Sequence, residues 1–131
     1  MKHLLRSTSR EFFAGLEDAG ISFTQVRCIG LLSDAGEPLP LTALSEQIGL
    51  SLPAVSRAVD GLVKRGELKR AEDQADRRSK LVSVTARGRA TYERLIAVRL
   101  AGVERFVDTL EPDEREALAA AVNPIAERLG R

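Results

Sequence analysis

The strongest constraint on the fold of this chain is a helix signal that runs from Ser51 to Arg65 and stops at a glycine. Ser51 is a favoured helix N-cap, because its hydroxyl can accept a hydrogen bond from a backbone amide of the first turn. Pro53 fits that first turn, where a missing amide hydrogen breaks no intrahelical bond, and Gly66 is favoured just beyond a helix end. These signals predict one helix of about four turns.

The two faces of this predicted helix differ in character. At about 100° per residue, one face holds apolar residues, which are Val55, Val59, Leu62 and Val63. The opposite face holds small and polar residues, which are Pro53, Ala54, Arg57, Asp60, Gly61 and Lys64. We expect the first face to join a core, and Arg57 is the one long donor on the second face that could reach a base edge or a phosphate. By itself the pattern is equally typical of an ordinary amphipathic surface helix.

A shorter helix is predicted directly before this one. Thr42 is its expected N-cap, Leu44 and Ile48 form its inner face, and Gly49 ends it. The order helix, tight glycine turn, helix is the helix-turn-helix arrangement, in which the first helix braces the second across the DNA backbone.

After Gly66 the apolar period changes from that of a helix to that of strands. Residues 68–72 and 80–84 alternate in polarity and are separated by a polar stretch from Asp73 to Ser79, which predicts a β-hairpin with a charged tip. A two-stranded hairpin is marginal alone. We expect it to pack on the helices through apolar residues, which are Leu68, Leu81 and either Val82 or Val84.

Charge is unevenly distributed along the chain. Residues 51–89 contain ten basic and five acidic residues, a net charge of +5, whereas the remainder carries −4 and the whole chain only +1. A local basic surface on a nearly neutral protein is typical of a phosphate-binding face, although charge clusters are often only solvated surface.

The order of these residues resembles the MarR family of bacterial winged-helix transcription regulators. The shared pattern comprises Leu41-Thr42, Ile48-Gly49-Leu50-Ser51, Val55-Ser56-Arg57, Val59-Asp60, Leu62, Arg65-Gly66, Leu68, Arg70, Asp76-Arg77-Arg78 and Val84-Thr85-Ala86-Arg87-Gly88. The Asp-x-Arg at the hairpin tip, followed by Val-Thr-x-x-Gly, is the most specific part. The resemblance implies a homodimer that binds a pseudo-palindromic operator in double-stranded DNA, and in many relatives a small phenolic or lipophilic effector releases the DNA.

The resemblance also assigns DNA contacts residue by residue. In the recognition helix these are Ser51, Pro53, Ala54, Ser56, Arg57 and Lys64, and in the wing they are Asp76, Arg77, Arg78 and Lys80. Arg78 would enter a minor groove, whose negative potential attracts arginine, and the Asp76 carboxylate would orient it. Arg77, Lys80 and Lys64 would contact phosphates. The alternative for Asp76 and Arg78 is a surface ion pair of little energetic value.

Long apolar stripes flank this region. A first helix is predicted from about Leu4 to Ala19, and its stripe consists of Leu5, Phe12, Phe13 and Leu16. A long helix is predicted from Thr85 to about Leu110, and its stripe consists of Tyr92, Ile96, Val103, Val107 and Leu110, widened by Leu95, Leu100 and Phe106. A last helix is predicted from Pro112, and its stripe consists of Leu118, Val122, Ile125 and Leu129. Pro124 is expected to kink or interrupt the last helix. The stripes favour a helical layer shared by two copies. Both ends of the chain are shorter than is usual in the family.

The predicted fold class is therefore mainly α with a small β-hairpin wing, a winged helix-turn-helix with a helical dimerisation layer. We expect one domain over residues 1–131, with the DNA-binding lobe at 24–88 and the dimerisation layer at 1–20 and 89–131.

The second helix is predicted to begin at Thr24 as N-cap, with Phe23 packing over Cys28 as a hydrophobic staple. A pocket for an effector would lie near Phe12, Leu16 and Phe23, residues that are more often core than ligand contacts. Cys28 is interpreted as a small buried hydrophobe, and a thiol-sensing regulator is kept as an alternative function.

Catalysis, metals and cofactors find little support in the sequence. The one histidine, His3, lies near a terminus, and there is no Cys/His cluster at metal spacing, no glycine-rich phosphate loop and no nucleophile elbow. One cysteine fits a reducing compartment, and no apolar run approaches the roughly 18 residues that span a bilayer. We therefore expect a cytoplasmic regulator without cofactor or membrane partner, either a DNA-binding repressor or a winged-helix protein-interaction module that does not bind DNA.

Overall fold

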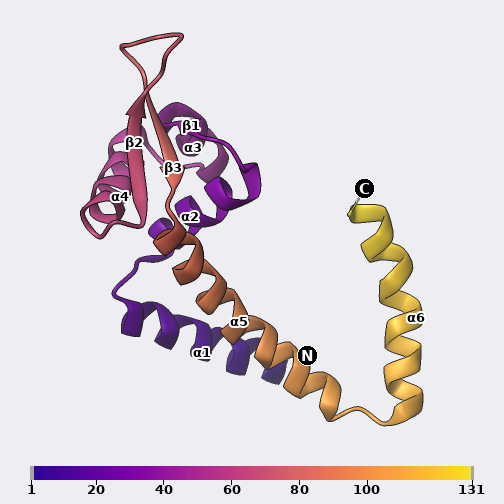
Figure 1. Cartoon of the computed structure of the whole chain (residues 1–131). Coiled ribbons are helices and arrows are strands. Elements are labelled where there is room, and N and C mark those ends of the chain that lie inside the picture. The colour runs from indigo at the N-terminus through magenta and orange to yellow at the C-terminus, as the bar shows by residue number, and fades with distance from the viewer. Residues whose placement is uncertain (1, 131) are drawn as a thin grey trace.

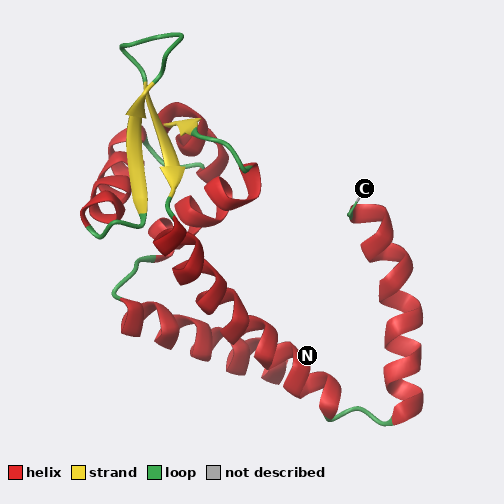
Figure 2. Ribbon diagram, in the orientation of Figure 1, coloured by secondary structure: helices red, strands yellow, loops and turns green. Residues whose placement is uncertain are grey.

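The computed structural model describes residues 2–130, with side chains from Ser9 onward. The helices are α1 (Lys2–Ala19), α2 (Phe23–Ala35), α3 (Leu41–Ile48), α4 (Leu52–Lys64), α5 (Ala86–Asp108) and α6 (Pro112–Leu129), and the strands are β1 (Leu39–Pro40), β2 (Leu68–Glu72) and β3 (Lys80–Val84). The predicted helix-turn-helix is α3 and α4, and the predicted hairpin is β2 and β3. The fold class expected from the sequence, a mainly helical winged helix-turn-helix, is confirmed (Figure 2).

Three parts of the molecule are distinct in space. Helices α2, α3 and α4 surround a small antiparallel sheet in the order β1-β3-β2, whose long hairpin projects from one end (Figure 1). Helix α5 leaves this lobe as a long diagonal rod and α1 lies across it, whereas α6 stands apart beyond a short connection. Among the described residues, none of the helices has the length and apolar character needed to cross a membrane.

The lobe is organised around one core. Its buried members are Cys28, Ile29, Leu32, Leu44, Ile48, Val55, Val59, Leu62, Leu68 and Val82. The predicted inner face of α4 is confirmed, with Val63 only partly buried at its margin. The structure also decides between the residues proposed for the hairpin. Val82 is fully buried because β3 is the central strand and turns this residue toward the helices, while Leu81 and Val84 are half-buried.

A second, smaller core joins α1, α2 and α5. Its buried members are Phe12, Leu16, Ile21, Val26 and Leu95. Of the predicted first-helix stripe, Phe12 and Leu16 are buried, Phe13 is 54% exposed, and the side chain of Leu5 lies outside the described residues. Gly20, with φ of +66°, ends α1 as expected.

The start of α2 differs from the sequence-based prediction. The N-cap is Ser22, not Thr24: the Ser22 hydroxyl accepts from the Gln25 backbone amide at 3.1 Å, and the Gln25 side-chain oxygen accepts from the Ser22 amide at 2.9 Å. This capping box satisfies two free amides at once, which a cap at Thr24 would not do. The residues positioned as a staple are consequently Ile21 and Val26, both in the smaller core, and Phe23 is exposed instead of packing over Cys28.

The N-cap predicted for α3 is also wrong. The helix begins at Leu41 with Pro40 in the cap position and no side-chain cap. The reason lies in β1, because Pro40 pairs with Leu81 of β3 and the chain passes from that pairing directly into the helix. Thr42 therefore lies within the first turn and is exposed.

The long helices correct two further expectations. Helix α5 is capped by Thr85 as predicted. Of the expected apolar residues Leu95 is buried, but the other buried residues are Gly88, Thr91 and Gly102, and Val103 is 47% exposed. The inward direction is set by the packing of α5 against α1 rather than by the most apolar side of the helix. Helix α6 begins at Pro112 as predicted but continues through Pro124 without interruption, and none of its residues is buried.

Candidate nucleic-acid interface

The turn before α4 is held by hydrogen bonds from three elements. Arg27 Nη1 donates to the Ile48 carbonyl at 3.1 Å, and Ser45 Oγ donates to the Leu50 carbonyl at 2.6 Å. Ser51 is the N-cap, as predicted, and its hydroxyl accepts from the Ala54 amide at 3.4 Å. These bonds fix the direction in which α4 leaves the turn, and hence the face that it presents to solvent.

The outer face of α4 lies where the sequence predicted it. Of the residues expected to contact DNA there, Ser51, Pro53, Arg57 and Lys64 are exposed, while Ala54 and Ser56 are half-buried. The same helix buries Val55, Val59 and Leu62 completely, so the core holds the helix while its opposite side stays free.

The wing tip is built by backbone capping. The Asp73 carboxylate accepts from the Ala75 amide at 2.9 Å, and the Asp76 carboxylate accepts from the Arg78 amide at 3.1 Å. The structure thus places Asp76 against the backbone of Arg78, whereas the sequence-based interpretation had the carboxylate orienting the guanidinium. Arg77, Arg78 and Lys80 are all exposed.

An ion pair between Arg70 on β2 and Asp60 on α4 connects the two presenting elements. Both residues belong to the family pattern quoted above, but the sequence predicts a role in the site for neither of them. Their pairing depends on how the hairpin folds back on α4, which a sequence separation of ten residues does not reveal. The pair fixes the wing relative to the recognition helix.

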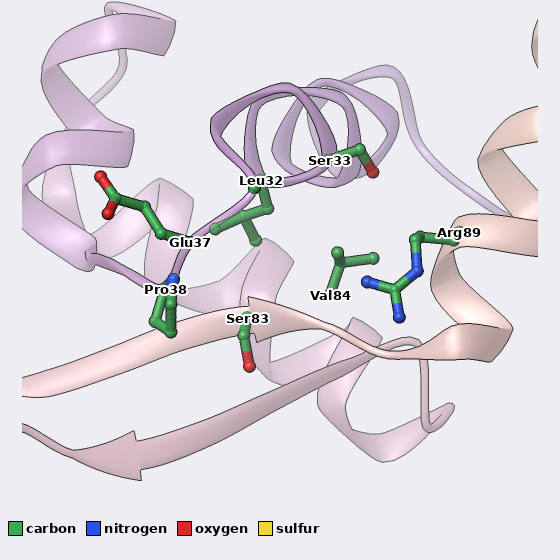
Figure 3. A pocket seen from close by; sticks show the side chains of 8 residues that line it. Leu32, Ser33, Glu37, Pro38, Ser83, Val84 and Arg89 are labelled. Carbon is green, nitrogen blue, oxygen red and sulfur yellow. The ribbon is translucent and has the colours of Figure 1, made fainter.

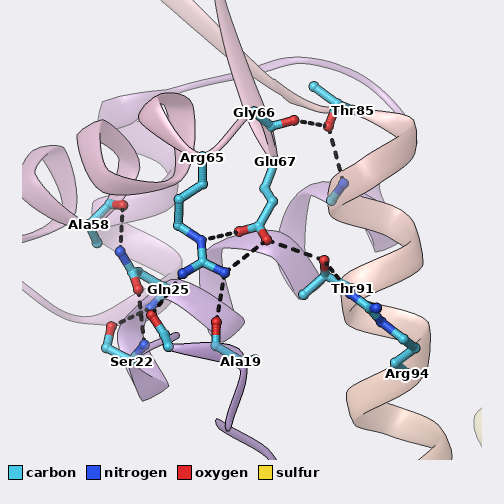
Figure 4. A network of polar contacts seen from close by, with 12 residues as sticks. Ala19, Ser22, Gln25, Ala58, Arg65, Gly66, Glu67, Thr85, Thr91 and Arg94 are labelled. Carbon is cyan, nitrogen blue, oxygen red and sulfur yellow. Dashed lines mark hydrogen bonds and ion pairs between the residues drawn. The ribbon is translucent and has the colours of Figure 1, made fainter. Parts of the chain in front are cut away.

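A polar network joins the lobe to the end of α1 and to α5 (Figure 4). Arg65 donates to the Glu67 carboxylate at 3.2 and 3.3 Å, and also to the carbonyls of Ala19 at 2.7 Å and Gly20 at 3.1 Å. Arg65 thus attaches the end of α1 to the junction between α4 and the wing. Such a multiply bonded guanidinium restrains the angle between the two parts.

Glu67 extends this network to α5. It is 1% exposed, and its carboxylate accepts from the Thr91 hydroxyl at 3.2 Å. Arg94 in turn donates to Thr91 at 3.3 Å. A buried carboxylate is stable here because a guanidinium and a hydroxyl satisfy it. The alternating pattern of the hairpin gave no signal for this role, since Glu67 precedes the strand and reads as a surface residue.

The backbone at the same junction is closely packed. Thr85 donates through its hydroxyl to the Gly66 carbonyl at 2.6 Å, and through its amide to the Glu67 carbonyl at 3.1 Å. A Cβ at Gly88 would lie 2.1 Å from the Glu67 carbonyl oxygen. Only glycine fits this position, and the contact fixes the start of α5 against the base of the wing.

Of the residues proposed for an effector pocket, two share a core and the third does not join them. Phe12 and Leu16 are buried in the smaller core, and Phe23 is exposed at the start of α2. A hollow of about 380 Å³ lies instead between α1 and α5, lined by Gly15, Asp18, Ala19, Thr91, Arg94, Leu95 and Val98. A smaller pocket of about 90 Å³ lies between α2, the loop before β1, β3 and the start of α5, where Ser33, Ser83 and Arg89 contribute polar groups (Figure 3).

Cys28 occupies the centre of the lobe core with no exposed surface. Burial raises the pKa of its thiol to about 11, with the Arg27 guanidinium acting in the opposite direction. A thiol that stays protonated at neutral pH is a poor nucleophile. Among the described residues, no group of histidine, cysteine and carboxylate side chains is placed to hold a metal ion.

Comparisons with known proteins show what this chain is similar to. A family model described as "MarR family" matches residues 19–79, from the end of α1 to the wing tip. The HTH-type transcriptional regulator YfiV of Bacillus subtilis is 26% identical over 143 residues, covering 98% of this chain and 89% of that protein. A MarR-family regulator from Silicibacter pomeroyi is 29% identical with a TM-score of 0.64, covering 98% of this chain and 86% of the other.

The fold is also shared with a structure of lower sequence identity. A point mutant of MepR from S. aureus, solved bound to an oligodeoxyribonucleotide, has a TM-score of 0.80 at 19% identity over 98% of this chain and 94% of that one. Helix-turn-helix, wing and flanking helices therefore agree in order and in space with these structures, and residues 19–79 of this chain match the MarR family of transcriptional regulators.

Proposed function

We propose that the protein is a repressor that binds a pseudo-palindromic operator in double-stranded DNA as a homodimer and responds to a small-molecule effector. The observation that carries the DNA partner is the free basic surface of α4 and the wing. Arg57, Lys64, Arg77, Arg78 and Lys80 are exposed, and none of them takes part in an ion pair within the described part of the chain. Cations without protein partners are available to phosphates. The MepR complex with an oligodeoxyribonucleotide supports the same partner.

The roles follow from position. The N-terminal half of α4 enters a major groove, where Ser51, Pro53, Ala54, Ser56 and Arg57 face the bases, as the leading residues of a recognition helix do. Arg78 reaches into the neighbouring minor groove. Lys64, Arg77 and Lys80 bind phosphates and set the register, and Asp76 shapes the turn that carries Arg78.

We assign the DNA-binding lobe to residues 24–88 and the dimerisation layer to residues 1–20 and 89–131. Large apolar side chains are exposed on the three helices of that layer, namely Phe13, Leu100, Val103, Phe106, Leu118, Val122, Ile125 and Leu129. A monomer rarely leaves so many large apolar side chains in water. A second copy of the chain would cover these stripes through a twofold-symmetric interface.

The effector site we propose is the hollow between α1 and α5. Two of its lining residues, Thr91 and Arg94, belong to the network that ends at Glu67 and Arg65. A ligand that takes their hydrogen bonds would loosen the restraint between the helices and the wing. Filling the hollow with Gly15→Leu should abolish release of the operator by phenolic or lipophilic compounds while DNA binding persists.

The decisive experiment is selection of bound duplexes from a random-sequence library, followed by titration of the recovered duplex at rising salt. We expect an inverted repeat and a loss of affinity of roughly a thousandfold between about 50 and 200 mM salt, as several phosphate contacts per dimer imply. No enrichment and no saturable, salt-sensitive binding would contradict this function and favour a protein-interaction module.

A further inference from the structure

Two leucines beside the N-cap of α4 are exposed without a structural reason. Leu50 is 41% and Leu52 is 43% exposed. The core contacts of this helix are already supplied by Val55, Val59 and Leu62. Exposed Pro53 follows Leu52, while Ser51 and Arg57 are polar, so the two leucines and the proline form a small apolar spot beside polar and basic residues.

The chain that carries these leucines is held firmly. The Leu50 carbonyl accepts from Ser45 Oγ, and the Ser51 hydroxyl caps the turn that begins with Leu52. Gly49, with φ of +77°, sets the turn in a conformation that other residues avoid. An apolar side chain on a fixed backbone loses little conformational freedom when it binds, so it can act as a preorganised contact.

We propose that Leu52, with Leu50 beside it, is a specificity-determining residue that contacts the 5-methyl groups of thymines in the major groove. The proposal rests on the proposed function, because it requires α4 to enter that groove. Thymine is the base that presents a methyl group there, and apolar side chains recognise it by contact. Leu52 is the first residue of α4 and lies beside Ser56 at the margin between the core face and the solvent, so it would meet the bases at the leading end of the helix.

A partner protein fits this spot less well than DNA does. A protein interface needs an apolar patch of several hundred square ångströms, whereas here the exposed apolar side chains are two leucines and Pro53, with polar Ser51 between the leucines. Contact with thymine methyl groups would also add an apolar form of base recognition, which the polar residues of this face do not provide. Arg57 is the one long side chain on the outer face of α4 suited to a hydrogen-bonded contact with a base, so the leucines add a second kind of discrimination.

The test uses the duplex recovered by selection, synthesised with deoxyuridine in place of individual thymines, which removes only the methyl group. We expect one or two positions in each half-site at which wild-type affinity falls about fourfold, the value of one methyl group taken out of water. In Leu52→Ala, the same substitutions should change affinity by less than about 1.5-fold. Leu50→Ala reports whether the neighbouring leucine shares the contact.

Leu100→Ala is the matched control, because it removes another exposed leucine, on α5. It should retain the full deoxyuridine penalty whatever its absolute affinity. The proposal is overturned if deoxyuridine at every thymine leaves wild-type affinity unchanged, or if Leu52→Ala keeps the wild-type penalty. Both results are obtained with DNA bound, and they therefore differ from failure of the proposed function, in which no duplex binds.

Discussion

The DNA-binding lobe and α6 represent opposite ways in which this chain forms structure. In the lobe, α2, α3, α4 and the sheet share a core whose members include Ile29, Leu44 and Leu62, each fully buried. Helix α6 buries nothing, and its own capping box, in which the Glu111 amide donates to Glu114 at 2.9 Å, is the main local order at its start. An isolated helix of 18 residues is marginal in water. The lobe core is therefore complete within one chain, whereas α6 has no buried residue in the described part of the chain, which agrees with the proposed second copy.

The largest expected effect compares two leucine truncations. Leu62→Ala, in the lobe core, should lower the free energy of unfolding by about 3 kcal/mol, because it removes buried methyl groups and leaves a cavity. The loss should be the same at all protein concentrations. Leu118→Ala, at a side chain 38% exposed on α6, should lower stability by less, and by an amount that shrinks with dilution, because the interface contributes nothing once both proteins are monomeric. Urea unfolding of both variants at two protein concentrations measures these losses. Equal losses of stability in the two variants would contradict the comparison.

The second largest effect is expected from a charge introduced on α6. Ile125→Glu should weaken the dimer at least about 100-fold, since it places a charge in an apolar interface without a partner. Light scattering across a dilution series measures this. Ala120→Glu adds the same charge on the opposite side of α6 and should leave the dimer intact. A monomeric wild-type protein would show that α6 has another partner.

Within the lobe, Arg78→Ala should lower operator affinity about 30-fold and leave the dimer unchanged, because it removes a minor-groove contact at an exposed tip. Fluorescence anisotropy with the selected duplex gives the affinity. Arg128→Ala removes an exposed arginine from α6 and should stay within about twofold of wild type. Equal affinities of wild type and Arg78→Ala would remove the wing from the mechanism.

The smallest effect concerns Cys28 in the lobe core. Its pKa is about 11 in the folded protein against 9.0 for a free thiol, so the folded state favours the protonated form. The stability that this contributes is fully present below about pH 9 and is lost as the pH rises through about 11. Unfolding of wild type and Cys28→Ala at about pH 8 and about pH 10.5 isolates the effect, and the difference between them should shrink at the higher pH. A persistent difference, or loss of DNA binding on mild peroxide treatment that Cys28→Ala prevents, would favour thiol sensing instead.

Local chemistry explains which parts could be predicted. Ser51, Pro53 and Gly66 framed α4 correctly, since caps and turn residues act through neighbours in sequence. At the start of α2 two local signals compete, and the sequence-based prediction of Thr24 as N-cap is wrong. Thr24 has the chemistry of a cap, but Ser22 has Gln25 to complete a capping box. The similarity to transcription regulators agrees with the expectation that the protein is not an enzyme.

Long-range contacts were outside the reach of sequence reasoning. The pair Asp60–Arg70 and the network of Arg65, Glu67 and Thr91 join residues from different elements, and their residue types alone suggest solvated surface. The inward side of α5 was also missed, because Thr91 and Gly102 are less apolar than Val103 or Leu100 and face α1 only through the packing of two helices.

By itself the sequence determined the order of the elements, the helix-turn-helix, the basic hairpin and the face of α4 that meets solvent, because hydrophobic period, caps and turn residues act over a few neighbours. Only the tertiary structure decided that Glu67 is buried under Arg65, that Asp76 holds a backbone amide and that Leu50 and Leu52 remain in water at the leading end of α4. Burial and pairing are properties of residues brought together from distant parts of the chain, and no local pattern contains them.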